Sequence, residues 1–333
     1  MLKKIKKTFK IVVLVLAAIL VVVAIAYLYF GYAPKPIPPQ LSVNIQQATI
    51  NIGSLERSYL FYIPKNLPSN APLVFVFHAS MQDGQAMRVS TGYEFERLAE
   101  EEKFVVIYPN GYQQNWNDCR KTASYPARTM NIDDKSFVST LIEKFTSDYK
   151  IDSKRVFATG YSNGGHLAYR LAMEMPDKIT AIAAVAASLP TPNNNDCQES
   201  KQPIPVMIIN GTADPINPYN GGKVTLFGFG NRGTVLSSLE SAQYFANFDK
   251  QVTQPIISTL PHQEIADSTN VQKYEYQSSS QNRPKVVLYV VENGGHVVPQ
   301  PIYNAPRILG QTSHSINAPL EIWKFFAQQS SLR

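Results

Sequence analysis

Continuously apolar stretches alternate with stretches of helical periodicity through most of the chain. The apolar stretches predict buried strands at 72–80, 104–111, 155–160, 181–188, 205–214 and 285–296. Apolar residues recur at helical spacing at 95–103, 134–150, 166–175 and 318–329. Two earlier segments, 44–52 and 57–64, alternate apolar and polar residues like antiparallel strands. Buried strands that alternate with helices predict an α/β fold, with a mainly parallel sheet covered by helices on both faces.

The first 33 residues have the pattern of a membrane segment. An apolar run of about 20 residues starts at Ile11, which is long enough to cross a bilayer at about 1.5 Å per residue. The lysines before it should stay cytoplasmic, so the rest of the chain should emerge on the other side. We therefore predict four regions: a basic cytoplasmic N-terminus (1–10), a transmembrane signal anchor (11–33), a stiff Pro-rich linker that holds the domain off the membrane (34–43), and one folded domain (44–333).

A cleaved signal peptide is the alternative, with the small residues Ala24–Ala26 as the cleavage site. The apolar run is long for a signal peptide, because it continues through Tyr27–Phe30, and cleavage at Ala33 would place Pro34 next to the cut. An uncleaved anchor is therefore favoured. A lipoprotein is disfavoured because no cysteine follows the run. In either case the domain is expected outside the cytoplasm.

Charge and cysteine content exclude several function classes. The net charge is +6, but five of the basic residues precede the apolar run: Lys3, Lys4, Lys6, Lys7 and Lys10. The rest of the chain is close to neutral and has no basic stripe, so nucleic-acid binding is not expected.

The two cysteines, Cys119 and Cys197, suit a disulfide in an oxidising compartment, with two separate thiols as the alternative. No zinc site, other metal, cofactor or obligate protein partner is predicted.

The segment "GYSNGG" at 160–165 sets Ser162 between two glycines, where a predicted strand turns into a predicted helix. A nucleophilic serine occupies such a turn in a nucleophile elbow, and the N-terminus of the following helix favours developing negative charge. The alternative is a glycine-rich turn with no catalytic role, since the motif arises by chance in roughly one chain in ten of this length. A base and an acid elsewhere are needed to decide.

Asp214 and His296 each follow a predicted strand, where functional side chains of parallel sheets lie. Serine needs a base to remove its proton, histidine titrates near neutrality, and a carboxylate orients the imidazole. The chain order Ser162, Asp214, His296 is that of the α/β-hydrolase fold. Taken singly, Asp214 could instead cap a turn before Pro215, and His296 could be an exposed turn residue. The other histidines are His78, His166, His262 and His314; only His314 is a serious rival, and it follows no strand.

The loop after the strand at 72–80 is the candidate oxyanion loop. A backbone N–H of Ala79 or Ser80 would act together with the N–H of Asn163, the residue after the nucleophile. His78 and Gln82 are expected to brace this loop, with ordinary loop polarity as the alternative.

An ordered series of segments resembles the polyhydroxybutyrate-depolymerase and feruloyl-esterase-like family of α/β hydrolases. The series includes "ERSYLFYIP", "PLVFVFHASMQ", "YPNGYQQNWNDCR", "VFATGYSNGGHLAYRLAMEMPD", "INGTADPINPYNGG" and "LGQTSHSINAPLEIWKFF". The resemblance implies a secreted serine esterase acting on hydroxyacyl or hydroxycinnamoyl esters, with Ser162 as nucleophile, Asp214 as acid and His296 as base. It also implies a Cys119–Cys197 disulfide.

The chain departs from this family at two places. His78-Ala79-Ser80 replaces the usual His-Gly-Cys, and alanine enters positive-φ conformations only at a cost, so a differently shaped oxyanion hole is expected. Val297 and Val298 stand where an aromatic residue is common. Trp116 either lines the cleft or belongs to the core.

These observations predict an extracytoplasmic serine esterase that hydrolyses carboxylic esters. A peptidase or acyltransferase on the same scaffold is an alternative, because attack on the carbonyl is shared. A catalytically silent cell-surface binding protein is another. No room for a polymer-binding module is evident after Arg333, which favours short soluble or oligomeric esters.

Overall fold

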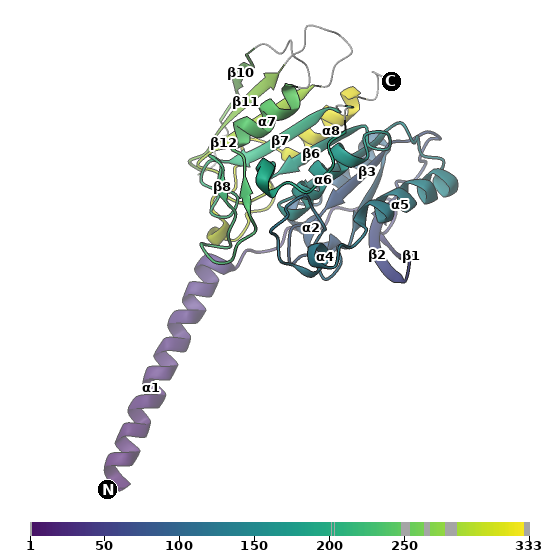
Figure 1. Ribbon diagram of the computed structural model, residues 1–333. Coiled ribbons are helices and arrows are strands. Elements are labelled where there is room, and N and C mark those ends of the chain that lie inside the picture. The colour runs from purple at the N-terminus through teal and green to yellow at the C-terminus, as the bar shows by residue number, and fades with distance from the viewer. Residues whose placement is uncertain are drawn as a thin grey trace.

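A ten-stranded sheet forms the centre of the domain (Figure 1). The computed structural model describes residues 2–200, 202, 204–247, 254–262, 267–276 and 285–329. In spatial order the strands are β1 (Gln46–Ile52), β2 (Leu55–Tyr62), β4 (Val105–Pro109), β3 (Leu73–Phe77), β5 (Val156–Tyr161), β6 (Ala181–Val185), β7 (Val206–Gly211), β12 (Val286–Glu292), β11 (Asn270–Tyr276) and β10 (Ile256–Thr259). The run from β4 to β12 is parallel, and antiparallel strands close both edges. The predicted α/β sheet is confirmed.

Helices cover both faces of the sheet, because its strands are apolar on both sides. Phe75 of β3 packs into one core and Val74 into the other, as alternation along a strand requires. On the face of Phe75 lie α5 (Asp134–Tyr149), α6 (Asn163–Glu174) and α7 (Ser238–Ala246). On the face of Val74 lie α2 (Gly84–Ser90), α3 (Glu94–Glu102) and α8 (Ala318–Gln329). The predicted helices are all present, whereas α2, α7, the edge strand β10 and its neighbour β11 were not predicted.

Short elements lie in the loops around the sheet. They are α4 (Pro126–Thr129), η2 (Pro192–Asn194), η3 (Arg307–Leu309), and the two-stranded ribbon of β8 (Gly222–Lys223) and β9 (Thr234–Val235). We call residues 222–235 the β8–β9 flap. It packs on a small apolar cluster formed by Ile216, Val224 and Val235, with Leu226 and Leu309 against it. This cluster joins the flap to η3.

The N-terminal helix α1 (Leu2–Ala26) projects from the domain and continues as a π-helical turn, η1 (Tyr27–Gly31) (Figure 1). The span Lys4–Gly31 contains an apolar window with a mean hydropathy of 3.3, and none of this window is buried against the domain. However, η1 contacts η3, and the Arg307 guanidinium lies 4.4 Å from the centre of the Tyr29 ring. The domain therefore contacts the end of this helix, whereas the Pro-rich segment was expected to hold the domain off the membrane.

The end of the predicted linker also belongs to the domain. Leu41 and Val43 pack against the core, and the Ser42 N–H donates to Glu100 Oε1 at 2.7 Å. The folded domain thus begins before residue 44. At the other end, residues 330–333 of the predicted domain lie outside the described residues.

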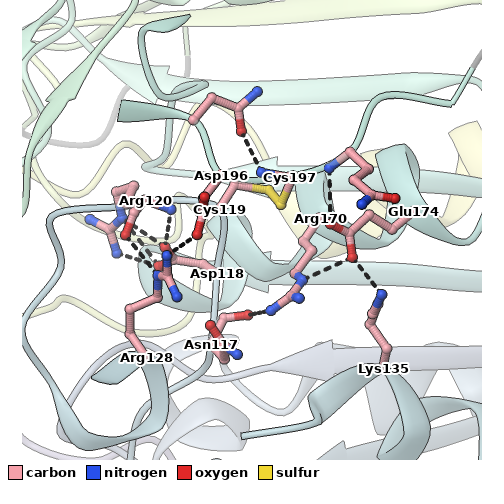
Figure 2. Close-up of a disulfide and its surroundings, with 12 residues drawn as sticks. Asn117, Asp118, Cys119, Arg120, Arg128, Lys135, Arg170, Glu174, Asp196 and Cys197 are labelled. Atoms are coloured by element: carbon pink, nitrogen blue, oxygen red, sulfur yellow. Dashed lines mark hydrogen bonds and ion pairs between the residues drawn. A yellow bond between two sulfur atoms is a disulfide. The ribbon is translucent and has the colours of Figure 1, made fainter. Parts of the chain in front are cut away.

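One disulfide joins Cys119 to Cys197, with a Cα–Cα distance of 5.0 Å, and confirms the pairing that the family resemblance implied (Figure 2). The two chain segments that carry these cysteines also contact each other directly. The Asp196 N–H donates to the Cys119 carbonyl at 2.9 Å, and Asp196 pairs with Arg128. The bridge thus fixes the loop after β4 to the loop after β6.

Removal of this disulfide should lower stability substantially. The bridge closes a loop across a sequence separation of 78 residues, for which chain entropy predicts roughly 4.5 kcal/mol. We expect the double variant Cys119→Ser/Cys197→Ser to unfold at lower denaturant concentration than the wild type by about this free energy. Reductant should destabilise the wild type and leave the double variant unchanged. Equal stability of the two proteins under oxidising conditions would contradict the prediction.

Candidate active site

Ser162 lies in a strained turn between β5 and α6. Its backbone has φ 55° and ψ −115°, and its N–H donates to the Val185 carbonyl at 2.8 Å. A Cβ at Gly160 would lie 2.2 Å from the backbone of Gly164, and a Cβ at Gly164 would lie 2.4 Å from the Phe77 carbonyl oxygen. Only glycine lets the chain pass this closely, so the G-x-S-x-G spacing follows from backbone contact.

Ser162, His296 and Asp214 form one hydrogen-bonded series. Ser162 Oγ lies 2.9 Å from His296 Nε2, and His296 Nδ1–H donates to Asp214 Oδ2 at 2.7 Å. Asp214 Oδ1 accepts the backbone N–H groups of Ile216 and Asn217 at 2.7 and 2.8 Å. The side chains of His296 and Asp214 are almost fully buried. In this geometry the imidazole can take the serine proton while the carboxylate stabilises the imidazolium.

The loop after β12 is held from two sides at His296. The His296 N–H donates to the carbonyl of Leu309 in η3 at 2.6 Å, and the Tyr161 hydroxyl donates to the His296 carbonyl at 2.6 Å. Burial, and then the charge of Asp214, raises the pKa of Tyr161 above its ordinary value, so this hydroxyl keeps its proton and remains a donor. Tyr161 was not singled out from the sequence, although it directly precedes the serine.

His78 braces the candidate oxyanion loop. Its Nδ1–H donates to the Ala79 carbonyl at 2.8 Å, and its Nε2 accepts the Gly111 N–H at 2.8 Å. These two contacts require the neutral imidazole, and burial lowers the pKa of His78 to about 4. The loop is thus tied to the chain after β4.

The rest of this loop is tied to other segments. Met81 carries a positive φ of 63°, while Ala79 is absent from the positive-φ residues of the described chain, so alanine brings no backbone strain here. Ser80 Oγ accepts a hydrogen bond from Arg232 of the β8–β9 flap at 3.2 Å. Gln82 Oε1 is buried and has no hydrogen-bond partner among the described residues. Arg232 was not predicted as part of the site.

Asn163 is fixed by a buried polar network beneath the elbow. Its Oδ1 accepts the Trp116 N–H at 2.8 Å, and its Nδ2 donates to Asp118 Oδ2 at 2.7 Å and to the Tyr125 hydroxyl at 3.0 Å. Burial would raise the pKa of Asp118, but the charge and hydrogen bonds of Arg120 bring it to about 2. Asp118 and Arg120 flank Cys119, so the disulfide and this network brace the same turn (Figure 2).

Trp116 belongs to the core, which corrects the cleft-lining alternative. It has no exposed surface, packs edge-on against Phe77, and donates its indole N–H to the His78 carbonyl at 2.9 Å. Its apolar body fills the space under the loop, and its polar edge satisfies that carbonyl. Val297 and Val298 are also buried and offer no open pocket wall.

The other histidines lie outside the hydrogen-bonded series. His314 Nδ1 lies 3.6 Å from Asp267 Oδ2 and has no hydrogen-bond partner among the described residues, so the carboxylate nearest the rival base is Asp267 and not Asp214. His262 Nδ1 lies 3.2 Å from Ser315 Oγ. His166 is buried on α6, and burial lowers its pKa well below the ordinary value. Among the described residues, no group of His, Cys, Asp and Glu has the arrangement of a metal site.

The sheet order and the elbow between β5 and α6 define an α/β hydrolase. The chain belongs to the dienelactone hydrolase family, whose match covers residues 59–225. The fold also resembles the solved acetyl xylan esterase from Aspergillus awamori, with a TM-score of 0.52, 17% identity, and coverage of 78% of this chain and 96% of that one.

Several curated relatives are named esterases. Feruloyl esterase D of Neurospora crassa is 25% identical over 86% of each chain. A probable feruloyl esterase C of Aspergillus niger is 28% identical over 57% of this chain and 67% of its own length. A bifunctional acetylxylan esterase/xylanase of Neocallimastix patriciarum is 31% identical over 47% of this chain, but the match covers only 21% of that protein. The predicted resemblance to feruloyl-esterase-like α/β hydrolases is confirmed.

The neutral state of His78 predicts a loss of stability in acid. Because its folded pKa of about 4 lies below the ordinary 6.5, the unfolded chain binds a proton first as the pH falls. The free energy of unfolding should therefore fall between pH 6.5 and 4, with up to about 3 kcal/mol due to His78. We expect the free energy of unfolding of His78→Gln, measured by denaturant titration, to fall less than that of the wild type between these two pH values. The exposed His262→Gln is the matched control, and identical pH slopes for wild type and His78→Gln would contradict the assignment.

Proposed function

We propose that this protein is a serine esterase that hydrolyses carboxylic esters. The observation that carries the proposal is the series Ser162–His296–Asp214, with its two links of 2.9 and 2.7 Å at the ends of β5, β12 and β7. Each of these side chains has the chemical type that its role needs. The names of the esterase relatives agree with this chemistry.

In the proposed mechanism, Ser162 Oγ attacks the ester carbonyl while His296 Nε2 takes its proton. Asp214 holds the ring and stabilises its charged form. The imidazolium then protonates the leaving alcohol, and an acyl-enzyme remains on Ser162. Water, deprotonated by the same imidazole, attacks this acyl group and releases the acid with the regenerated serine.

The oxyanion of the tetrahedral intermediate would lie against backbone N–H groups of Asn163 and of Ala79 or Ser80. None of the hydrogen bonds of the described residues uses these three N–H groups, so they remain free to donate. The anchoring of His78 and Asn163 keeps the loop and the helix start in place before substrate arrives. Such preorganisation is usually the largest single contribution to acyl transfer.

For the acyl group, we propose the hydroxycinnamoyl, acetyl or short hydroxyacyl class. The relatives named feruloyl and acetylxylan esterases support the first two. A panel of methyl ferulate, p-nitrophenyl acetate and hydroxybutyrate oligomers would order the three by kcat/KM.

Replacement of the nucleophile should abolish turnover. We expect Ser162→Ala to lower kcat for p-nitrophenyl butyrate by roughly 10⁴-fold or more, because the acyl-enzyme cannot form. Ser69→Ala, at an exposed serine remote from the series, is the matched control and should retain wild-type kcat. A folded wild type without activity on the whole ester panel would favour the binding-protein alternative, and activity retained in Ser162→Ala would refute the assignment.

We further propose that α1 is an uncleaved anchor and that the domain lies outside the cytoplasm. The apolar span Lys4–Gly31, the preceding lysines and the disulfide support this placement.

The uncleaved anchor makes a simple prediction for expressed full-length protein. The mature protein should keep the mass of the whole chain and remain in the membrane pellet after a carbonate wash. Protease added outside the cell should reach the domain. A soluble product whose N-terminus starts after Ala26 would show that the segment is a cleaved signal peptide.

A further inference from the structure

The end of the proposed anchor contacts the domain at η3, and the length of the anchor indicates where the membrane surface lies. The 20 residues from Ile11 to Phe30 span about 30 Å, which is the thickness of the hydrocarbon core. The aromatic residues of η1 therefore fall at the outer interface, where tyrosines are enriched. Tyr29, one of them, contacts Arg307 of η3. With α1 as the proposed anchor, this contact places η3 at the depth of the lipid headgroups.

The same short helix adjoins the catalytic loops. The carbonyl of Leu309, the last residue of η3, accepts the N–H of His296. Leu309 also packs on the cluster that contains Ile216, whose N–H donates to Asp214. His296 therefore contacts η3 directly and Asp214 is linked to it through Ile216, and η3 is the segment that η1 contacts.

The β8–β9 flap extends this surface to the other side of the site. Leu226 of the flap packs on the same cluster as Leu309, and Arg232 of the flap donates to Ser80 in the candidate oxyanion loop. The flap thus connects η3 with the oxyanion side of the active site. It borders the site rather than lying remote from it.

The tip of the flap and η3 expose large apolar side chains. Phe229 is 80% exposed, Ile308 is 47% exposed and Phe227 is 42% exposed. Aromatic side chains exposed beside a membrane anchor are suited to the bilayer interface, where their rings leave water. We call these three residues the apolar rim.

We propose that the apolar rim inserts into the outer interface of the bilayer that α1 spans, so that the active site takes ester substrates held at that bilayer surface. The proposal rests on the proposed serine esterase function and on the uncleaved anchor. The substrate class is an amphiphilic ester whose apolar part stays in the membrane while its carbonyl reaches Ser162. A second copy of the chain is the competing occupant of the rim.

A fluorescence experiment on the full chain tests the insertion without using activity. The chain has only Cys119 and Cys197, which are bridged, so Phe229→Cys provides a single site for an environment-sensitive label. Ile257→Cys is the matched control, because Ile257 is 55% exposed on β10, at the far end of the domain from α1 (Figure 1). Intact mass confirms that the anchor is present in both proteins.

In phosphatidylcholine vesicles that contain brominated lipid, the label at 229 should be quenched and the label at 257 should not. No quenching at 229, or equal quenching at both sites, would overturn the proposal. Shielding at 229 that depends on protein density and not on brominated lipid would assign the rim to a second copy, and would overturn it too.

An activity experiment tests the consequence for the substrate. Full-length Phe227→Ser/Phe229→Ser in vesicles is compared with Ile256→Ser/Ile257→Ser, on p-nitrophenyl butyrate in solution and on p-nitrophenyl palmitate dissolved in the same vesicles. We expect the rim variant to lose about tenfold on the bilayer-held ester and little on the soluble one, because two apolar anchors are removed. The control variant should keep its activity on both esters.

The outcomes separate the two proposals. Equal losses on both esters would show that the rim supports the site itself and would overturn the membrane proposal. Absence of hydrolysis of either ester by the wild type would instead count against the esterase function, while the quenching result would still decide the insertion.

Discussion

The close passage of α6 against β3 and β5 is the constraint on which the rest of the site depends. The first turn of the helix can approach these strands only because residues 160 and 164 lack a Cβ. The tight turn that leads into the helix places Ser162 at a positive φ, which costs of order 1–3 kcal/mol. The hydrogen bond to Val185 and the buried anchoring of Asn163 hold the turn against this cost. The serine hydroxyl is thereby presented above the carboxyl ends of the parallel strands.

The partner loops are held by contacts between segments distant in sequence. Tyr161 on β5 fixes the His296 carbonyl, and η3 fixes the His296 N–H. The disulfide fixes Cys119, which directly follows Asp118, and Asp118 in turn accepts a hydrogen bond from Asn163. The β8–β9 flap and η3 share one apolar cluster, and η3 also contacts η1, the continuation of α1. The active site and the proposed membrane anchor are therefore parts of one connected surface.

Much of the fold was predictable because its signals are local. Continuous apolar strands and the G-x-S-x-G turn each lie within a few residues, and the strand-end rule then pointed to Asp214 and His296, which the structure brings to Ser162. The rival base His314, which was ranked below His296 from the sequence, has its Nδ1 3.6 Å from Asp267 Oδ2.

The features that sequence did not predict depend on contacts between remote segments. Trp116 is buried because the oxyanion loop folds over it, and nothing in its neighbours in sequence distinguishes that from a cleft wall. The contact of Arg232 with Ser80 joins residues 152 positions apart. β11 was missed because it carries polar residues at most of its positions, as an edge region allows. The docking of η1 on η3 had no signal in the chain at all.

The most direct test of the central claim is covalent labelling by diethyl p-nitrophenyl phosphate, read by intact mass and peptide mapping. The reagent forms a phosphate ester on an activated serine and releases p-nitrophenolate, so it reports the nucleophile without a choice of substrate. We predict a single diethylphosphoryl adduct on Ser162, with labelling strongly slowed in His296→Ala. An adduct on another residue, or labelling of Ser162 at the same rate without His296, would contradict the account.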